Sequence, residues 1–593
     1  MKRIVVGLSA FLISTAPAWA VQPVLPGPQL LCHRTANEDV PENTLESLEQ
    51  AALLGCNVVE LDLRRTLDGK IVLNHDGLLE RLTDGTGDAE KSFYGDLQLR
   101  DVGSWMADRF TGMHVVLLED VLRMARQMDV RLVLDMKSKD MGPDVLQMLQ
   151  REGMLQRVQF NAEWQEVKKL YPEATDAGYM TAWVQPGVTA EQVNGYHRQG
   201  KAVVANFSAN DHQMDLASMK AAVAAGVDGI NVDFPRIGAD AVGRPVEQTL
   251  RALILSADSG GSDDRVKAIL QLARYQGFPL QDKFELWLLD PDDHVSRAAA
   301  LALVNARPNT TPSVFDEALR SDHSKVRANA AWALGMLKAP ADMLLPLLRD
   351  KDPQVLQQVL LALSRMPGNV RTDVLLPMFS NNDSSVRSAA ALTLAKHQPD
   401  AAVVAIPTQL QKEITAERII YEDYVKRGRP TLTEAEVATI TASFRCQVQM
   451  MHALSMIKGE AATKLLAAQA FRPDDDFSQF NGIIAGFQLW DRIMEDPKLA
   501  VAALASTDTT VADRAEWMLV KAGKAVLPEV RKAMGSENSS VRSRAVQIAG
   551  WQGDLESLPT LRSMQAANGP DAAQATWAIG VIESLNPKRL GQQ

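Results

Sequence analysis

The chain has 593 residues, of which 46% are hydrophobic and 23% charged, and its formal net charge is -11. This length exceeds what one hydrophobic core supports, so we expect at least two domains in a globular protein. The acidic balance argues against nucleic acid as a partner, because such binding depends on basic contacts to phosphate. It does not exclude a small phosphorylated substrate, because a metal ion and a few basic side chains can neutralise that charge locally.

The segment 1–20 has the pattern of a secretory signal peptide. Lys2 and Arg3 precede an apolar stretch at 4–13, and Ala18-Trp19-Ala20 fits the cleavage rule of small residues. The apolar stretch is shorter than the roughly 20 residues that span a bilayer, and no later stretch is long and apolar enough. We therefore expect an exported protein, most simply in a bacterial periplasm, without a transmembrane segment.

Residues 29–235, within a predicted domain at 21–250, alternate between strand-like and helix-like segments. Several of the strands are continuous Val/Ile/Leu runs of the kind buried in parallel sheets. Eight such units predict a TIM barrel, and the alternative is an open doubly wound sheet. A Gly-rich stretch at 77–115 interrupts the alternation and predicts a small inserted subdomain. The predicted strands are 29–33, 58–62, 71–75, 131–136, 157–161, 179–184, 202–207 and 229–233.

Three cysteines occur, Cys32, Cys56 and Cys446. Cys32 lies near the end of one predicted strand and Cys56 before the start of the next. Because these ends lie far apart in a pair of parallel strands, we expect no Cys32–Cys56 bridge and three buried thiols instead.

A Gly/Ser run at 256–262 predicts a linker over 251–262, and a helical repeat follows over 263–593. The repeat is marked by a polar turn, a valine and an Ala/Leu-rich helix at a nearly constant spacing, which predicts HEAT-like helical hairpins. Residues 410–480 break the period and predict an insertion with a basic loop, either a binding surface or a merely solvated face. The marker valines are Val266, Val295, Val326, Val355, Val386, Val511 and Val541.

Acidic side chains at the ends of predicted strands indicate a metal site. Glu60 and Asp62 are two residues apart, so they point to the same face, and Asp135 ends a later strand. Side chains at the carboxyl ends of barrel strands meet at one mouth. Three carboxylates there suit a hard divalent cation, although a single one would more often cap a helix or form a salt bridge.

Two histidines at strand ends, His33 and His75, are the candidates for acid–base catalysis, because imidazole titrates near neutral pH. Arg34 can donate two hydrogen bonds to phosphate oxygens, and Lys137 can add a positive charge. Each histidine could instead be a core residue or a metal ligand.

Residues 29–238 resemble the glycerophosphodiester phosphodiesterases. The resemblance rests on His33-Arg34, Pro41-Glu42-Asn43-Thr44, Glu60-Leu61-Asp62, Thr66-Leu67-Asp68-Gly69, His75-Asp76, Arg81-Leu82-Thr83, Gly85-Thr86-Gly87, Gly226-Val227-Asp228-Gly229-Ile230 and Asp233-Phe234-Pro235.

The resemblance implies a TIM barrel with an insertion after the third strand and a divalent metal, Mg²⁺ or Ca²⁺. Glu60, Asp62 and Asp135 would bind the metal, and His33 and His75 would be catalytic. Arg34 would hold phosphate, while Glu42 would support the first loop.

The chain departs from the family pattern at three positions. Thr35 stands where the family has Gly, Asp135 where it usually has Glu, and Phe207 where a Trp lines the glycerol pocket. These changes leave the substrate's alcohol and the choice of metal open.

We therefore predict an exported, metal-dependent enzyme that hydrolyses glycerophosphodiesters to an alcohol and glycerol 3-phosphate. One alternative is a phosphodiesterase for lysophospholipids or another exported phosphodiester. Another is a non-catalytic barrel on a repeat scaffold that binds a partner protein.

Overall fold

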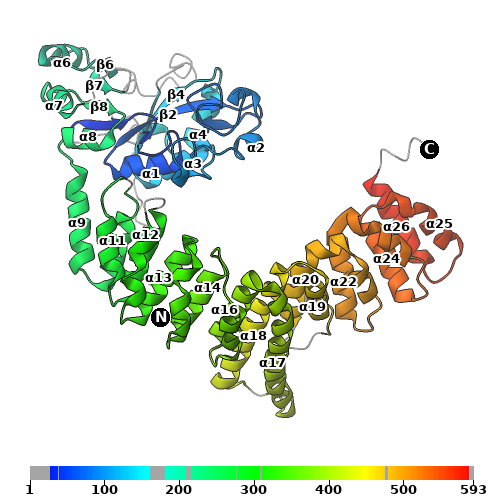
Figure 1. Cartoon of the computed structure of the whole chain (residues 1–593). Helices are drawn as coiled ribbons and strands as arrows, with labels where there is room; N and C mark the ends of the chain where they lie inside the picture. Colours follow the sequence, from blue (N-terminus) through cyan, green and yellow to red (C-terminus); the bar gives the residue numbers. More distant parts are fainter. Residues whose placement is uncertain are drawn as a thin grey trace, which may run out of the picture. The chain divides into compact units, whose positions relative to one another are not determined.

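A computed structural model describes residues 27–586 apart from 38, 161–180, 209–214, 276, 307–309, 430 and 474–478. The predicted signal peptide lies outside these residues. The chain divides into two compact units, Met1–Phe284 with Asn305–Thr311, and Glu285–Val304 with Pro312–Gln593. The first unit thus extends beyond residue 250. Figure 1 shows strands and helices in the first unit and helices alone in the second.

The first unit is a TIM-barrel type of curved parallel sheet whose strand order is β5-β4-β2-β1-β8-β7-β6 (Figure 1). The first strand pairs with both β2 and β8. Pairing between the first and last strands is typical of a barrel and unlike the open doubly wound alternative, in which the last strand lies at an edge. The strands are β1 (Gln29–Cys32), β2 (Val58–Arg65), β3 (Ile71–Leu73), β4 (Arg131–Met136), β5 (Val158–Phe160), β6 (Thr181–Val184), β7 (Ala202–Phe207) and β8 (Gly229–Val232).

The predicted third barrel strand is wrong in direction. β3 pairs with β2 antiparallel, with Leu73 opposite Leu63. The connection between them is a short turn in which the Thr66 amide donates to the Lys70 carbonyl at 2.9 Å. Parallel neighbours need a crossover of a dozen or more residues, so this connection permits only a hairpin. The described residues therefore contain seven parallel strands where eight were predicted.

The stretch that follows β3 forms the predicted small subdomain. It contains the short helices η1 (Ala89–Lys91), α2 (Tyr94–Leu97) and η2 (Asp108–Phe110). These pack around a small apolar cluster that includes Leu97, Phe110 and Met113 and also Val72 of β3.

Helices cover the sheet and continue past it. The predicted linker at 251–262 is helical as far as Ser259, because α9 runs through it, and Gly260 and Gly261 separate α9 from α10. The first unit's longer helices are α1 (Leu45–Leu53), α3 (Leu118–Gln127), α4 (Gly142–Arg151), α6 (Ala190–His197), α7 (Leu216–Ala224), α8 (Pro235–Ala241), α9 (Val246–Ser259) and α10 (Ser262–Leu272).

A disulfide joins Cys32 and Cys56, with a Cα–Cα distance of 6.0 Å, so the expectation of free thiols at these positions was wrong. The reason is the stagger of the barrel. β1 has only four residues, and its last residue, Cys32, lies opposite Val59 at the start of β2. Cys56 comes just before that start, so the two sulfurs meet. Cys446 is a free, buried thiol as expected.

The second unit consists of helices that pack in sequence from α13 through α14, α16, α18, α20, α22 and α24 to α26. None of the described helices is both long and apolar enough to cross a membrane. The helices are α11 (Gln281–Leu288), α12 (Asp293–Asn305), α13 (Ser324–Met336), α14 (Pro353–Leu363), α15 (Thr372–Leu375), α16 (Ser384–His397), α17 (Pro399–Lys426), α18 (Glu434–Met456), α19 (Glu460–Ala470), α20 (Gln479–Glu495), α21 (Lys498–Ala503), α22 (Thr509–Ala522), α23 (Leu527–Ala533), α24 (Ser539–Trp551), α25 (Leu558–Ala566) and α26 (Ala572–Leu585).

The marker valines lie near the amino ends of their helices, and those of the second unit are buried. Val266 belongs to the first unit instead. The arginine that follows some of these valines ties one repeat to the next. Arg327 donates to the carbonyl of Ser321 at 2.8 Å and binds the carboxylate of Asp350 in the next repeat at 2.7 and 3.0 Å.

The break in the period at 410–480 corresponds to two long helices, α17 and α18, which pack against each other. Polar groups lie between them. Glu413 is 5% exposed and binds Arg387 of α16, while its own carbonyl accepts a hydrogen bond from Ser443. These contacts join the inserted pair to the regular repeats.

Candidate active site

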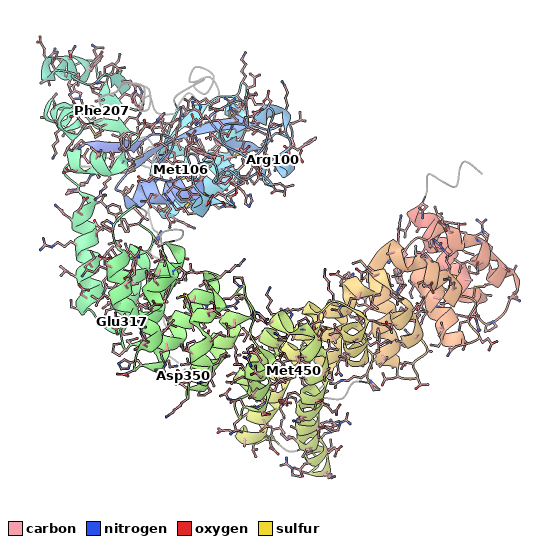
Figure 2. The ribbon with its side chains drawn as sticks, viewed as in Figure 1. Arg100, Met106, Phe207, Glu317, Asp350 and Met450 are labelled. Atoms are coloured by element: carbon pink, nitrogen blue, oxygen red, sulfur yellow. A yellow bond between two sulfur atoms is a disulfide. The ribbon has the colours of Figure 1, made fainter. Side chains whose placement is uncertain are left out.

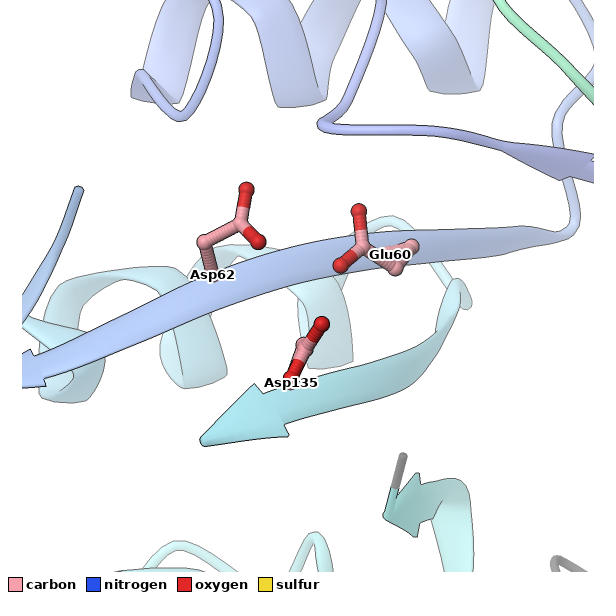
Figure 3. Close-up of side chains that lie close together, drawn as sticks. All are labelled: Glu60, Asp62 and Asp135. Carbon is pink, nitrogen blue, oxygen red and sulfur yellow. The ribbon is translucent and has the colours of Figure 1, made fainter. Parts of the chain in front are cut away.

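Three carboxylates meet on β2 and β4, two from within β2 and one from near the carboxyl end of β4. Asp62 and Asp135 are partners in the parallel register, and Glu60 precedes Asp62 by two residues on the same face. One oxygen from each of the three lies within 4.8 Å of the others, and Figure 3 shows the two β2 carboxyl groups beside that of β4. The structure thus brings together the predicted metal ligands in an arrangement that suits a hard cation.

The three carboxylates of the cluster repel one another, because nearby cations neutralise only part of their negative charge. Burial raises the pKa of Glu60 to about 8, and the charges of Asp62 and Asp135 contribute to the shift. Lys137 offsets part of this charge, because its Nζ lies 2.7 Å from Asp135 and 3.2 Å from Asp62. Burial opposes the charge on Lys137, but these carboxylates outweigh it and raise the pKa of Lys137. A divalent cation would relieve the remaining repulsion, so the residues fit a metal.

Arg34 lies next to this cluster, on the loop that follows β1. Its amide donates to Glu60 at 2.8 Å, while its guanidinium stands 3.6 Å from both Glu42 and Asp62. The Nε group of Arg34 is buried and makes no hydrogen bond within the part of the chain that the structure describes. Arg34 therefore has a donor in reserve, as a phosphate-binding residue requires.

Thr35 occupies a backbone conformation that favours glycine, with φ of 73°. This explains why glycine is usual here in the family that the sequence resembles. Polar contacts hold the threonine in place. Its amide donates to the Glu60 carbonyl at 3.2 Å, and its buried hydroxyl contacts Ser47 and accepts from the Asn43 amide at 3.2 Å. The loop is thus kept in shape without the glycine.

His33 follows β1 and is held by an aspartate. Its Nδ1 lies 2.7 Å from Asp233, which directly follows β8 and also accepts a hydrogen bond from Asn37 at 2.9 Å. Because a carboxylate only accepts, Nδ1 is the donor and Nε2 is left for substrate. Burial alone would lower the pKa of His33, but the hydrogen bond to Asp233 and the charge of Glu60 outweigh it, so the pKa is raised.

His75 follows β3 and has a similar partner. Its Nδ1 lies 2.6 Å from Asp76, and Arg81 binds the other oxygen of Asp76 at 2.5 Å. The hydrogen bond from Arg81 lowers the pKa of Asp76 to about 2. Arg81 also binds Glu42 at 2.9 Å, and Glu42 in turn faces Arg34. Ion pairs thus run from His75 through Asp76, Arg81 and Glu42 to Arg34. Glu42 contacts Arg34 on the first loop, the loop that it was predicted to support.

Phe207 is not placed as predicted. It is fully buried on β7 (Figure 2) and pairs in register with Val232, whereas Asn206 pairs with Asn231. Since side chains alternate along a strand, Phe207 lies on the opposite face from Asn231, and Asp233 shares the face of Asn231. Phe207 therefore packs in the core and does not line the site.

Sequence reasoning missed the polar pair on that face. Asn231 donates to Asn206 at 2.7 Å, and the buried Oδ1 of Asn231 has no hydrogen-bond partner among the described residues. Asp233 and Arg81 were noticed only as parts of motifs, without a role. A signal was available, because Asn231 and Asp233 interrupt an otherwise apolar strand end with the same spacing as Glu60 and Asp62.

Comparisons with known proteins agree with this arrangement. Residues 33–182 match the Glycerophosphoryl diester phosphodiesterase family, and residues 311–395 match HEAT repeats. The protein YhdW of Bacillus subtilis is 27% identical over 234 residues, 35% of this chain and 94% of that relative. A glycerophosphodiester phosphodiesterase of the same organism is 33% identical over 126 residues, 20% of this chain and 43% of the relative.

A solved glycerophosphodiester phosphodiesterase from Agrobacterium tumefaciens is 24% identical, with a TM-score of 0.32; the match covers 36% of this chain and 99% of that one. The matched family segment begins at His33 and includes all three carboxylates of the cluster. The chain therefore carries a glycerophosphodiester phosphodiesterase-like domain, of the phosphoric diester hydrolase class, joined to HEAT-like repeats.

Proposed function

We propose that the protein is an exported, divalent-metal-dependent phosphodiesterase that hydrolyses glycerophosphodiesters to an alcohol and glycerol 3-phosphate. One observation carries the proposal: two histidines, each held at Nδ1 by an aspartate, accompany one cluster of three carboxylates and an arginine with a donor in reserve. His33 is the sequence neighbour of that arginine, and ion pairs link His75 to it through Asp76, Arg81 and Glu42. This set supplies the acid, base, cation site and anion site that phosphodiester cleavage needs.

Glu60, Asp62 and Asp135 would hold the metal, Mg²⁺ or Ca²⁺, which would polarise the phosphoryl group as a Lewis acid. Arg34 donates to a non-bridging phosphoryl oxygen. One of the two histidines accepts a proton at Nε2 from the attacking group, either water or a neighbouring hydroxyl of the substrate. The other carries a proton at Nε2 and gives it to the leaving alcohol oxygen. Asp233 and Asp76 hold Nδ1 of His33 and of His75, which leaves both Nε2 atoms for these transfers.

The polar pair on β7 and β8 supports a polyol in the substrate. The buried Oδ1 of Asn231 can accept a hydrogen bond from a hydroxyl, and an apolar group beside it would leave it unpaired. We assign this oxygen to a glycerol hydroxyl.

The Cys32–Cys56 disulfide supports export, because disulfides persist in oxidising compartments such as the periplasm and are rare in the cytosol. The pattern of residues 1–20 is consistent with this. Fractionation of the producing cell, with amino-terminal sequencing of the mature chain, tests the proposal. A cytosolic chain that begins at residue 1 would refute it.

Release of glycerol 3-phosphate from glycerophosphocholine and glycerophosphoethanolamine, with Mg²⁺ or Ca²⁺ added after chelation, tests the activity. We expect turnover that depends on the metal and is lost in His33→Ala and His75→Ala. Turnover of lysophospholipids alone would favour the first alternative. Metal-independent binding without turnover of any diester would favour a non-catalytic barrel.

A further inference from the structure

The second unit exposes aromatic side chains on helices that pack against each other. Phe487 and Trp490 lie on α20, and Trp517 lies on α22. Phe487 is 57% exposed and Trp517 is 56% exposed, although both are large and apolar. Clusters of exposed apolar side chains on a soluble protein usually mark a binding surface.

These side chains line a groove between α20 and α22 with a volume of about 440 Å³. Arg514, one of the residues that line the groove, is held in place by α20 and by a backbone carbonyl. Arg514 crosses α20 at Gly482, where a Cβ would lie 2.3 Å from the guanidinium, and donates to the carbonyl of Ala470 at 2.6 Å. The groove is therefore a built feature of the two helices. We call the surface formed by Phe487, Trp490, Trp517 and Lys521 the aromatic groove.

The groove holds one ammonium group. Nζ of Lys521 lies 4.9 to 5.5 Å from the ring centroids of Phe487, Trp490 and Trp517. Cation–π attraction fixes a lysine in such a position without neutralising its charge. No carboxylate of the described residues forms an ion pair with Lys521, while the nearby Asp513 is bound by Arg544 at 2.6 Å.

The next repeat also exposes aromatic side chains. Trp551 on α24 is 59% exposed, and its ring centroid lies 5.3 Å from that of Trp577 on α26. Trp551 follows its marker valine, Val541, by ten residues, as Lys521 follows Val511. The neighbouring repeat therefore offers further aromatic side chains to a ligand that extends beyond the groove.

We propose that the aromatic groove binds a polypeptide segment of a partner protein, which places an apolar side chain among the rings and a carboxylate on Lys521. Tryptophan is enriched among the residues that dominate binding energy in protein interfaces. A glycan can also stack on such rings, but a neutral one would leave the ammonium of Lys521 uncompensated. The charge therefore favours an acidic peptide. The proposal is independent of the activity of the barrel.

Selection of a phage-displayed library of random dodecapeptides against the full chain tests this proposal. We expect enriched peptides that combine an aromatic or aliphatic residue with Asp or Glu. Their synthetic forms should bind Trp517→Ala and Lys521→Glu at least tenfold more weakly. Lys524→Glu, an exposed charge reversal three residues away and outside the groove lining, should bind normally.

A peptide whose acidic residue is replaced by Asn or Gln should lose a similar factor. The proposal fails if no peptide is enriched, or if enriched peptides bind the two groove variants as tightly as the parent. It also fails if cellohexaose binds the groove and competes with the peptides. Because Trp517 and Lys521 are exposed, circular dichroism and melting of the variants should match the parent, which separates lost binding from lost folding.

Discussion

Arginine–carboxylate contacts occur in both units, but they are built differently. In the repeats, Arg327 binds both oxygens of Asp350 and two backbone carbonyls, at 2.7 to 3.2 Å. In the barrel, Arg34 stands 3.6 Å from each of two carboxylates and keeps a buried Nε without a hydrogen bond. A fully satisfied arginine thus stabilises the fold, whereas an unsatisfied one is available to a ligand.

The carboxylates show the same contrast. Glu413 in the repeats receives two hydrogen bonds from Arg387, at 2.8 and 3.3 Å. Glu60 in the barrel is buried beside two other carboxylates. Its side chain accepts a hydrogen bond from the backbone amide of Arg34, and its pKa is raised to about 8. Arg387 thus neutralises the buried Glu413 within the repeats, whereas the barrel leaves a charge deficit at Glu60 that a cation can fill.

Histidine substitutions should give the largest difference between the units. We expect His33→Ala or His75→Ala to lower kcat by about 10²- to 10⁴-fold, the usual contribution of general acid–base catalysis. His397 of the repeats contacts only backbone carbonyls, at 2.8 and 3.2 Å, so His397→Ala should leave kcat unchanged. Steady-state rates of glycerol 3-phosphate release measure both, and equal losses at the three positions would contradict the assignment.

The charge deficit at Glu60 should appear as a dependence of stability on pH. Because its folded pKa is raised from 4.5 to about 8, the metal-free protein should lose stability as the pH rises between these values. The loss is on the order of 5 kcal/mol at most.

Mg²⁺ or Ca²⁺ should offset this loss above pH 8, and Glu60→Gln should lack both effects. Denaturant unfolding of the parent and of Glu60→Gln, with and without metal, measures the difference. Parallel pH profiles for the two proteins would contradict a charge deficit at this site.

The disulfide should make the barrel, and not the repeats, sensitive to reduction. Removing a cross-link between cysteines 24 positions apart costs about 3 kcal/mol in the chain-entropy account. We expect Cys32→Ser with Cys56→Ser to speed hydrogen exchange in β1 and β2 and to leave α13 to α26 unchanged. Faster exchange in both units would show that the cross-link does more than stabilise the barrel.

Replacing Arg34 or Arg327 by alanine should give smaller effects, on activity in the first case and on stability in the second. Arg34→Ala should lower kcat/KM by about 30-fold, roughly 2 kcal/mol for a charged hydrogen bond, with little change in Tm. Arg327→Ala should instead destabilise the second unit by about 2 kcal/mol and leave kcat/KM unchanged, because Asp350 loses its partner. A loss of both activity and stability in each variant would contradict this division of roles.

Much of the site could be predicted because strand periodicity is local. The spacing of Glu60 and Asp62 put both on one face, and Asp135 proved to be the register partner of Asp62. The repeats were equally visible, since the same valine recurs at a nearly constant spacing.

What sequence reasoning missed depends on how strands pair in space. The stagger that brings Cys32 to Cys56 and the hairpin that reverses β3 are properties of register and turn length. The aspartate that holds His33 lies 200 residues away, so no local pattern joins the two. Phe207 was placed by analogy with a tryptophan, whereas its face is set by its pairing with Val232.

The arginine contacts between repeats limit where the chain can be shortened or duplicated. Arg542 of α24 binds Asp571, just before α26 begins, as Arg327 binds Asp350 ahead of α14. A chain cut between residues 542 and 571 would keep the donor and lose its acceptor. Where a repeat carries this contact, an insertion or deletion that keeps both the arginine and its aspartate should disturb the stack least.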